Sequence, residues 1–318
     1  MKIVTIGELL VDLTQTGIDE NGIPQYSANP GGAPANAAVA ASLMGAEAAF
    51  IGKVGADSFG MMLADTLKSK NVDVCGLIQD KLNPTTLAVV SLDEKGERSF
   101  SFYRKDGADV MLTADEINTK LIDECDILHF GSVSLTDEPS ASAVRFAVEY
   151  AKNAGRVISY DPNYRPLLWN DKSRAVAEMR SLLKFVDIIK VSDEETILLT
   201  GENDIESAAK SLHGEGTGIV LVTLGEKGAY YLTDNAQGYV PAFTGTVADT
   251  NGAGDTFLGT FLTYAEDYSA LLKNENGLLT EAVTFACAAA GLSTRKSGAI
   301  PSMPTKTEVE EFISHYRK

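Results

Sequence analysis

Apolar runs and helical patterns alternate along most of the chain. The runs are short, and several, such as Asp187-Ile188-Ile189-Lys190-Val191, lack the polar alternation of a half-exposed strand. We expect strands at 2–7, 48–53, 126–131, 156–160, 187–191 and 218–223. Helices are expected near 33–45, 57–70, 138–154, 172–185 and 204–213, with a mostly helical region after about residue 252 that is Ala-rich from Glu281 to Thr294. This order predicts an α/β fold with a mainly parallel sheet between helices.

Two segments interrupt this alternation. Residues 11–30 contain two short polar–apolar alternations, and residues 84–104 contain two β-rich runs joined through Asp93-Glu94-Lys95-Gly96. The second segment has the pattern of a hairpin with a glycine-containing turn. We expect the two segments to form a small antiparallel sheet that stands off the main domain. The chain is therefore predicted to be one domain, 1–318, with a lid built from about 11–30 and 84–104.

The amino-acid composition limits the kinds of ligand and partner that the protein can bind. The 318 residues include 27 Lys and Arg against 44 Asp and Glu, a formal charge of −17. Such a surface repels nucleic acids and anionic membranes, so neither is expected as a partner. No run of 18 apolar residues occurs, the N-terminal run is too short for a signal peptide, and the three scattered cysteines suit a reducing compartment. A cytoplasmic protein is expected, and any anionic ligand must be held by local charges, amides or a metal ion.

A glycine-rich turn, Asp249-Thr250-Asn251-Gly252-Ala253-Gly254-Asp255, precedes a run with helical apolar spacing. The glycines leave backbone N–H groups uncovered where the helix begins, and a helix N-terminus attracts anions. Asp255 lies in the first helical turn, where a carboxylate could take a proton from an attacking hydroxyl. The turn therefore suggests phosphoryl transfer to an alcohol. Taken alone, it is equally compatible with an ordinary strand-to-helix turn in which Asp255 is only an N-terminal carboxylate.

Other phosphate-binding motifs are missing from the sequence. It contains no G-x-x-x-x-G-K-[ST], and no G-x-G-x-x-G follows the first strand. Its glycines instead cluster at Gly31-Gly32-Ala33-Pro34-Ala35-Asn36, with Gly45, Gly52, Gly55 and Gly60 behind, and at the turn before Asp255.

These two clusters resemble the N-terminal and C-terminal signatures of the ribokinase-like (PfkB) carbohydrate kinases. Thr260 is a departure, because glycine or alanine is usual there. The resemblance covers essentially the whole chain and implies a three-layer α/β/α sandwich. Within the family it is strongest to fructokinases, through Pro30–Asn36, Phe50–Gly55, Tyr160–Trp169, Lys190–Asp193 and Val222–Gly228.

The resemblance implies a role for each matching residue. Asp255 would be the catalytic base, and the amides of Gly252, Ala253 and Gly254 would form the anion hole for the transferred phosphoryl group. Substrate-binding residues are expected among the following: Asp12, Gly31, Gly32, Asn36, Tyr103, Arg104 and Arg165.

The nucleotide side is implied in the same way. The expected nucleotide-binding residues are Asn163, Lys190, Ser192, Thr223, Gly225 and Gly228. Glu195 would contact Mg²⁺ through water, although Ser192 stands where the family motif usually has asparagine. Mg²⁺ is expected with ATP because it offsets phosphate charge. Asp249 and the loop Ser297–Pro301 resemble the monovalent-cation loops of some relatives, which adds K⁺ as a candidate ion.

The leading hypothesis is an ATP-dependent fructokinase that phosphorylates the 6-hydroxyl of D-fructose. A 2-keto-3-deoxygluconate kinase is the nearest alternative, because Arg104 and Arg165 could serve the carboxylate of a sugar acid. A non-catalytic sugar sensor is the alternative from a different class, and the intact Gly252–Asp255 turn argues against it. A homodimer paired through the lid is a further expectation drawn from relatives.

Overall fold

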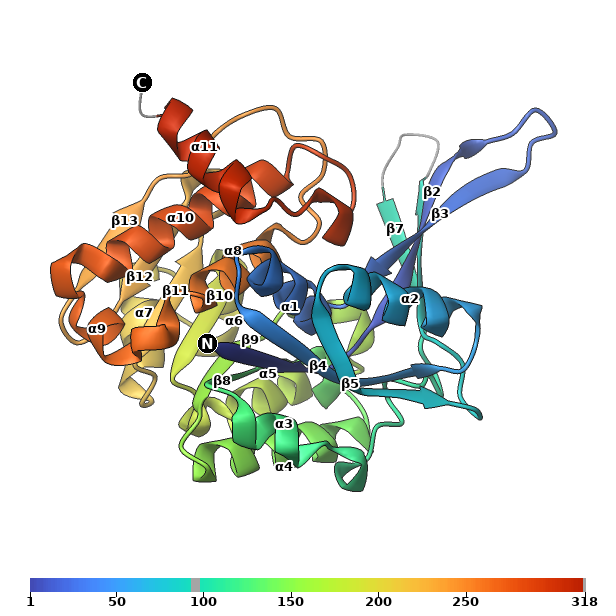
Figure 1. The fold of residues 1–318 in the computed structure, drawn as a ribbon, viewed down its shortest axis with the longest axis horizontal. Helices are drawn as coiled ribbons and strands as arrows, with labels where there is room; N and C mark the ends of the chain where they lie inside the picture. Colours follow the sequence, from blue (N-terminus) through green and yellow to red (C-terminus); the bar gives the residue numbers. More distant parts are fainter. Residues whose placement is uncertain (93–97, 317–318) are drawn as a thin grey trace.

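The computed structural model describes residues 1–92 and 98–316, so the expected turn at Asp93–Gly96 lies outside the described residues. Its main feature is a sheet of nine described strands (Figure 1). In spatial order the strands are β13 (Gln237–Val240), β12 (Ala229–Leu232), β11 (Ile219–Thr223), β10 (Ile188–Ser192), β9 (Val157–Asp161), β8 (Ile127–Gly131), β1 (Lys2–Ile6), β4 (Glu47–Gly55) and β5 (Val72–Asp80). Neighbours are parallel from β11 to β5, and β12 and β13 join antiparallel at one edge. The predicted α/β class with a mainly parallel sheet is confirmed.

Helices cover both faces of this sheet because its strands are apolar on both sides. In β1, Ile3 packs with the cluster that includes α8 and α10, whereas Val4 packs with the cluster that includes α4. One face carries α1 (Ala33–Leu43), α2 (Ser58–Ser69), α8 (Ala253–Leu262), α9 (Tyr268–Lys273) and α10 (Leu278–Ser293), with α11 (Lys306–Tyr316) packed outside α10 (Figure 1). The other face carries α3 (Thr119–Glu124), α4 (Ser140–Asn153), α5 (Lys172–Ser181), α6 (Asp193–Thr200) and α7 (Ile205–Gly214).

A second, four-stranded sheet projects from the body (Figure 1). Its spatial order is β3 (Pro24–Gly31), β2 (Leu10–Ile18), β6 (Leu87–Leu92) and β7 (Arg98–Tyr103). The pairs β2–β3 and β6–β7 are antiparallel, but β2 and β6 run parallel. The expectation of an antiparallel sheet was therefore wrong at this central pair. The chain reaches β6 only after passing through α1, β4, α2 and β5, and so long a crossover permits a parallel pairing that a tight hairpin does not.

The helix and strand boundaries lie close to those expected from the sequence. The expected helix at 172–185 is shorter, because α5 ends at Ser181 and a 3₁₀ turn, Leu183–Phe185, leads into β10. Two further 3₁₀ turns matter for the site, η2 (Val133–Leu135) after β8 and η3 (Pro166–Leu168) after β9. No helix in the described ranges is long and apolar enough to cross a membrane.

Candidate active site

A cavity of about 1190 Å³ lies between the small sheet and the carboxyl ends of the parallel strands. This edge of an open α/β sheet is where ligands usually bind. The lining residues come from both clusters that the sequence singled out. Of the expected site residues, the cavity brings together Asp12, Gly32, Asn36, Asn163, Arg165, Lys190, Ser192, Glu195, Asp249, Gly252, Gly254 and Asp255.

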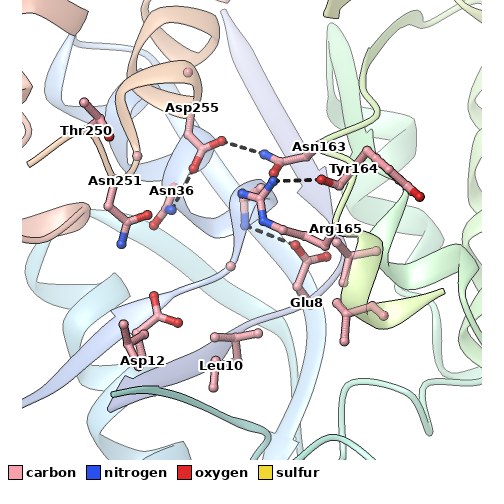
Figure 2. A pocket seen from close by; sticks show the side chains of 18 of the residues that line it. Glu8, Leu10, Asp12, Asn36, Asn163, Tyr164, Arg165, Thr250, Asn251 and Asp255 are labelled. Carbon is pink, nitrogen blue, oxygen red and sulfur yellow. Dashed lines mark hydrogen bonds between the residues drawn. The ribbon is translucent and has the colours of Figure 1, made fainter. Parts of the chain in front are cut away.

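Asp255 lies at the centre of this site, in the first turn of α8, and is only 7% exposed. Its Oδ2 accepts a hydrogen bond from the Asn36 side-chain amide at 2.8 Å, and its Oδ1 accepts one from the Asn163 amide at 3.0 Å (Figure 2). The two amides come from α1 and from the loop after β9, so three separate parts of the chain fix one carboxylate. A carboxylate held in this way keeps a constant orientation toward an incoming hydroxyl.

Glycines allow the close approach that this arrangement needs. A Cβ on Gly259 of α8 would lie 2.4 Å from the carbonyl oxygen of Ala37 in α1, so the two helices touch through their backbones. Gly252 precedes α8 with φ of +76°, and a Cβ there would lie 2.7 Å from the Cβ of Ala299. A residue with a side chain at position 252 would therefore be strained by its backbone and by its neighbour.

Buried charges surround the Asp255 carboxylate. Burial raises the pKa of Asp255, and the negative Asp161 adds to that effect, while Asn36, Lys190 and Arg165 oppose it. Lys190 pairs with Asp161 at 2.9 Å between Nζ and Oδ2, and both side chains are almost fully buried. Burial by itself would lower the pKa of Lys190, but Asp161, Glu195 and Asp255 outweigh it and raise the pKa. Lys190 is therefore a permanent cation beside the proposed base.

The start of α8 has the properties of an anion site. Its N-cap residue, Gly252, offers no side chain to cap the first amides. A Cβ on Gly254 would lie 2.9 Å from Lys190 Nζ, which places the ammonium group directly beside this turn. The Ala253 N–H donates to the Thr250 carbonyl at 3.3 Å, so that amide is already engaged within the turn. A helix N-terminus and an adjacent lysine together suit a phosphoryl group.

Asp12 marks the other end of the cavity, on β2. The backbone of Gly31 on the neighbouring β3 lies so close that a Cβ there would be 2.5 Å from Asp12 Oδ2. Burial raises the pKa of Asp12 to about 6, against the lowering effects of a hydrogen bond from Asn251 and of the positive Arg165. Asp12 therefore changes charge at a mildly acidic pH.

Glu195 is part of a helix cap as well as a lining residue. Its carboxylate accepts the Ser192 N–H at 2.8 Å and the Tyr164 N–H at 2.7 Å, and the Ser192 hydroxyl accepts the Glu195 N–H at 3.2 Å. This capping box opens α6. The carboxylate is buried and held by backbone donors, unlike the solvated carboxylate that a bare helix start would have. Each oxygen retains a lone pair that can accept from a bound water.

Asp249 joins the glycine turn to the loop before α11. Its Oδ1 accepts the Asn251 N–H and its Oδ2 accepts the Gly298 N–H, both at 3.1 Å. Ser297 and Gly298 also line the cavity. Within residues 1–92 and 98–316 no three His, Cys, Asp or Glu side chains gather as a metal cluster.

Some expected site residues do not line the cavity. Tyr103 is 67% exposed, and Arg104 is buried in an ion pair with Asp109 (Nε to Oδ2, 2.7 Å) and a hydrogen bond to Thr136. The expectation that Tyr103 and Arg104 contact substrate therefore finds no support in this geometry. Asp109 lies only five residues after Arg104, but the sequence pattern does not show that the chain turns back beyond β7 and pairs the two side chains.

The expected nucleotide residues at the end of β11 also lie off the cavity lining. Thr223 pairs in register with Ser192, so it sits one strand beyond the lining residues. Gly225 and Gly228 have φ of +57° and +105° and shape the turn into β12. A Cβ on Gly228 would lie 2.0 Å from the Val240 carbonyl oxygen, so this glycine is required by the fold itself. Gly31 and Ala253 likewise adjoin the lining residues without belonging to them.

Other lining residues were not predicted as site residues. Glu8 is a buried carboxylate whose pKa burial raises to about 7. Its position directly after a buried strand, at the edge where parallel strands end, was a signal that could have identified it. Further lining residues come mainly from the small sheet and neighbouring loops: Leu10, Thr14, Asn29, Ala88, Val90, Phe102, Lys172 and Asn251.

Comparison with known proteins extends these observations. A family model described as pfkB family carbohydrate kinase matches residues 1–306. The chain is 44% identical over 309 residues to fructokinase-2 of Solanum lycopersicum, covering 96% of this chain and 94% of the relative. It is 42% identical to fructokinase-1 of Zea mays, covering 98% and 97% respectively.

Solved structures show the same similarity. The fructokinase of Xylella fastidiosa with bound ATP superposes with a TM-score of 0.92 at 31% identity, covering 100% of this chain and 99% of that one. The fructokinase of Vibrio cholerae O395 with fructose, ADP and calcium bound has a TM-score of 0.86 at 33% identity and covers 98% of each chain. The three-layer ribokinase-like architecture expected from the sequence is thereby confirmed.

Proposed function

Because this chain belongs to the pfkB family of carbohydrate kinases, we propose that it is an ATP-dependent fructokinase. The 6-hydroxyl of D-fructose attacks the γ-phosphorus of ATP in line, the bond from that phosphorus to the β,γ-bridging oxygen breaks, and Asp255 accepts the hydroxyl proton. The products are fructose 6-phosphate and ADP. The relatives named above and the placement of Asp255 support this reaction together.

The main support for the proposal is that the side-chain amides of two asparagines hold the Asp255 carboxylate by hydrogen bonds. Asn36 and Asn163 occupy one lone pair of each carboxylate oxygen. The remaining lone pairs are free to align and deprotonate a hydroxyl. The α8 N-terminus and Lys190 lie on the side where negative charge develops, so their fields favour the transition state without later rearrangement.

We assign Asn163, Lys190 and Ser192 to the phosphate side of the nucleotide, because they line the cavity at the ends of β9 and β10. We propose that Thr223, Gly225 and Gly228, which lie off the cavity lining, approach the nucleotide from the side of the ribose. Mg²⁺ bound to ATP would offset phosphate charge, and Glu195 is placed to accept a hydrogen bond from water on that ion. A K⁺ site would use Asp249 and the backbone of the Ser297–Gly298 loop.

The cavity favours a neutral ketose over a sugar acid. Arg104, one of two arginines that could have bound a carboxylate, is neutralised by Asp109. Arg165 remains on the lining, but Asp12, whose pKa burial raises to about 6, lines the same cavity and at neutral pH would repel the carboxylate of a sugar acid. A 2-keto-3-deoxygluconate kinase is therefore the weaker candidate, and Asp12, Gly31, Gly32 and Asn36 are assigned to sugar hydroxyls.

We further propose that residues 1–318 act as one domain in which the small sheet serves as the lid. Its β2–β3 ribbon exposes Ile18, Ile23 and Tyr26, an apolar surface that a second copy of the chain would cover in a lid-to-lid dimer. The protein is assigned to the cytoplasm, where ATP and free fructose are both available.

A substrate panel tests the proposal. With ATP and Mg²⁺, the wild-type protein should release ADP fastest with fructose, and ¹H–³¹P correlation spectroscopy should locate the new phosphate on C6. A higher kcat/KM with 2-keto-3-deoxygluconate would move the assignment to the sugar acid. Binding of fructose without ADP release would leave the sugar-sensor hypothesis. Omitting K⁺ from matched buffers tests the monovalent site, and sedimentation velocity tests the dimer.

A further inference from the structure

Glu8 lies where the chain passes from the main body into the small sheet. Two residues later β2 begins at Leu10, and the β2–β3 ribbon returns through Gly31 to α1, which begins at Ala33. The Glu8 carboxylate links the chain segments at this junction, residues 8–10 and 31–33, which we call the neck. Its Oε1 accepts the Ala33 N–H at 3.1 Å, and its Oε2 accepts the Ser134 hydroxyl at 3.2 Å. One side chain therefore ties the entrance of the ribbon, its exit and the η2 turn together.

The backbone at this neck is as closely packed as the side chain. A Cβ on Gly32 would lie 2.3 Å from the Glu8 carbonyl oxygen, and Glu8 itself is 2% exposed. Asn36, which holds Asp255, lies in the first turn of α1, and Asp12 is the third residue of β2. Movement of the Glu8 carboxylate would therefore shift both residues relative to each other.

The other hairpin of the small sheet is closed in the same manner by Asp109. Thr86, just before β6, donates to Asp109 Oδ1, and Arg104, just after β7, pairs with Asp109 Oδ2. Asp109 does not line the cavity, whereas Glu8 does (Figure 2). Of these two carboxylates, Glu8 is thus the one whose position bears directly on a bound sugar.

We propose that Glu8 is a positioning residue for the sugar: its carboxylate holds the base of the β2–β3 ribbon against α1 so that Asp12 and Asn36 face the same ligand. This inference rests on the proposed sugar kinase function. In this role Glu8 is not the base for the fructose hydroxyl and touches no phosphate. It acts through the two residues on either side of the neck.

Glu8→Ala in the full chain tests the proposal by separating the two substrates. Losing the two hydrogen bonds that the Glu8 side chain accepts predicts a KM for fructose raised about tenfold, with the KM for ATP changed by less than about twofold. Glu8→Gln keeps an oxygen that can accept the Ala33 N–H, so it should recover most of the affinity. If Glu8→Ala does not fold, Glu8→Asp replaces it, because its shorter side chain moves the carboxylate oxygens away from their donors. The same result is expected: a raised KM for fructose with a nearly unchanged KM for ATP.

Glu116→Ala is the matched control. Glu116 accepts the Thr113 N–H at 2.9 Å at the start of the 3₁₀ turn Ala114–Glu116 and pairs with Lys53 at 2.7 Å, but it does not line the cavity. Glu116→Ala should lower Tm and leave the KM values for fructose and for ATP unchanged. A Glu8 variant that behaves like this control, or that raises both KM values equally, overturns the inference. If the wild type phosphorylates no fructose, the proposed function fails first, and calorimetric fructose binding to wild type and Glu8→Ala then decides the positioning role separately.

Discussion

The two ends of the cavity are built differently. The proposed phosphate end consists of α8 and of residues at the ends of β9 and β10. Its charged groups are buried: Lys190 pairs with Asp161, and Asp255 accepts hydrogen bonds from two side-chain amides. The sugar end is shared with the small sheet, whose β2–β3 ribbon is largely exposed toward its tip. Proton transfer and charge stabilisation need fixed dipoles in a dry place, whereas sugar binding needs a surface that can close over the ligand. The fold places the first task in its core and the second at its edge.

Removing the base should produce the largest effect. Asp255→Asn keeps the size of the side chain but cannot accept the proton, so kcat should fall by about 10³-fold or more. Calorimetric fructose binding should change far less than kcat, because Asp12 and the β2–β3 ribbon are untouched and only one of the two amides, Asn36 or Asn163, loses its acceptor oxygen. A kcat within tenfold of wild type would show that the two ends do not divide the work in this way.

Breaking the buried pair should affect stability at the phosphate end. Lys190→Met leaves Asp161 buried without its cation, which should reduce the free energy of unfolding by about 3 kcal/mol in urea denaturation. Lys68→Met removes an exposed pair with Asp65 and should cause no measurable change. An equal loss of unfolding free energy in Lys190→Met and Lys68→Met would contradict the expectation that the buried ion pair matters more for stability than the exposed one.

A variant of Arg104 tests whether this residue binds a charged group of the substrate. Arg104→Lys keeps the charge beside Asp109 but weakens the bond to Thr136, so the base of β7 should loosen and the fructose KM should rise by about threefold. The ratio of kcat/KM for fructose to that for 2-keto-3-deoxygluconate should stay the same. A change in that ratio would show direct contact between Arg104 and substrate, and Lys105→Arg on the exposed neighbouring residue serves as the control.

The last expected effect, similar in size to that of Arg104→Lys, is a pH dependence at Asp12. Its pKa is raised to about 6 by burial, and an ionised carboxylate accepts sugar hydroxyls better, so the fructose KM should rise about threefold as pH falls from 7 to 5.5. The effect on stability has the opposite sign. A carboxyl whose pKa is raised by folding contributes stability below its unfolded pKa, and this contribution is lost as pH rises through 6. Asp12→Asn should flatten the KM profile; an unchanged profile would assign the titration to another group.

Sequence-based prediction was better at the phosphate end. The Gly252–Asp255 motif is local, so backbone freedom, helix N-terminus and carboxylate are all encoded within a few residues, and the structure places Asp255 at the centre of the cavity. The sugar end was harder to predict. Arg104 was expected on the substrate but pairs with Asp109, and Glu8 was overlooked although it lines the site. Arg104 meets Asp109 because the chain turns back after β7, whereas Glu8 meets Ala33 and Ser134 only when distant segments fold together.

The sequence by itself determined the α/β class, the buried parallel strands and the two glycine clusters, and it singled out Asp255 as the candidate base, because hydrophobic periodicity and backbone-permissive residues act locally. Only the tertiary structure decided that β2 and β6 run parallel, that Asn36 and Asn163 grip Asp255, and which carboxylates close the base of the small sheet. Those features depend on which strands and side chains become neighbours in the buried interior. That is decided only when segments far apart in the sequence pack together.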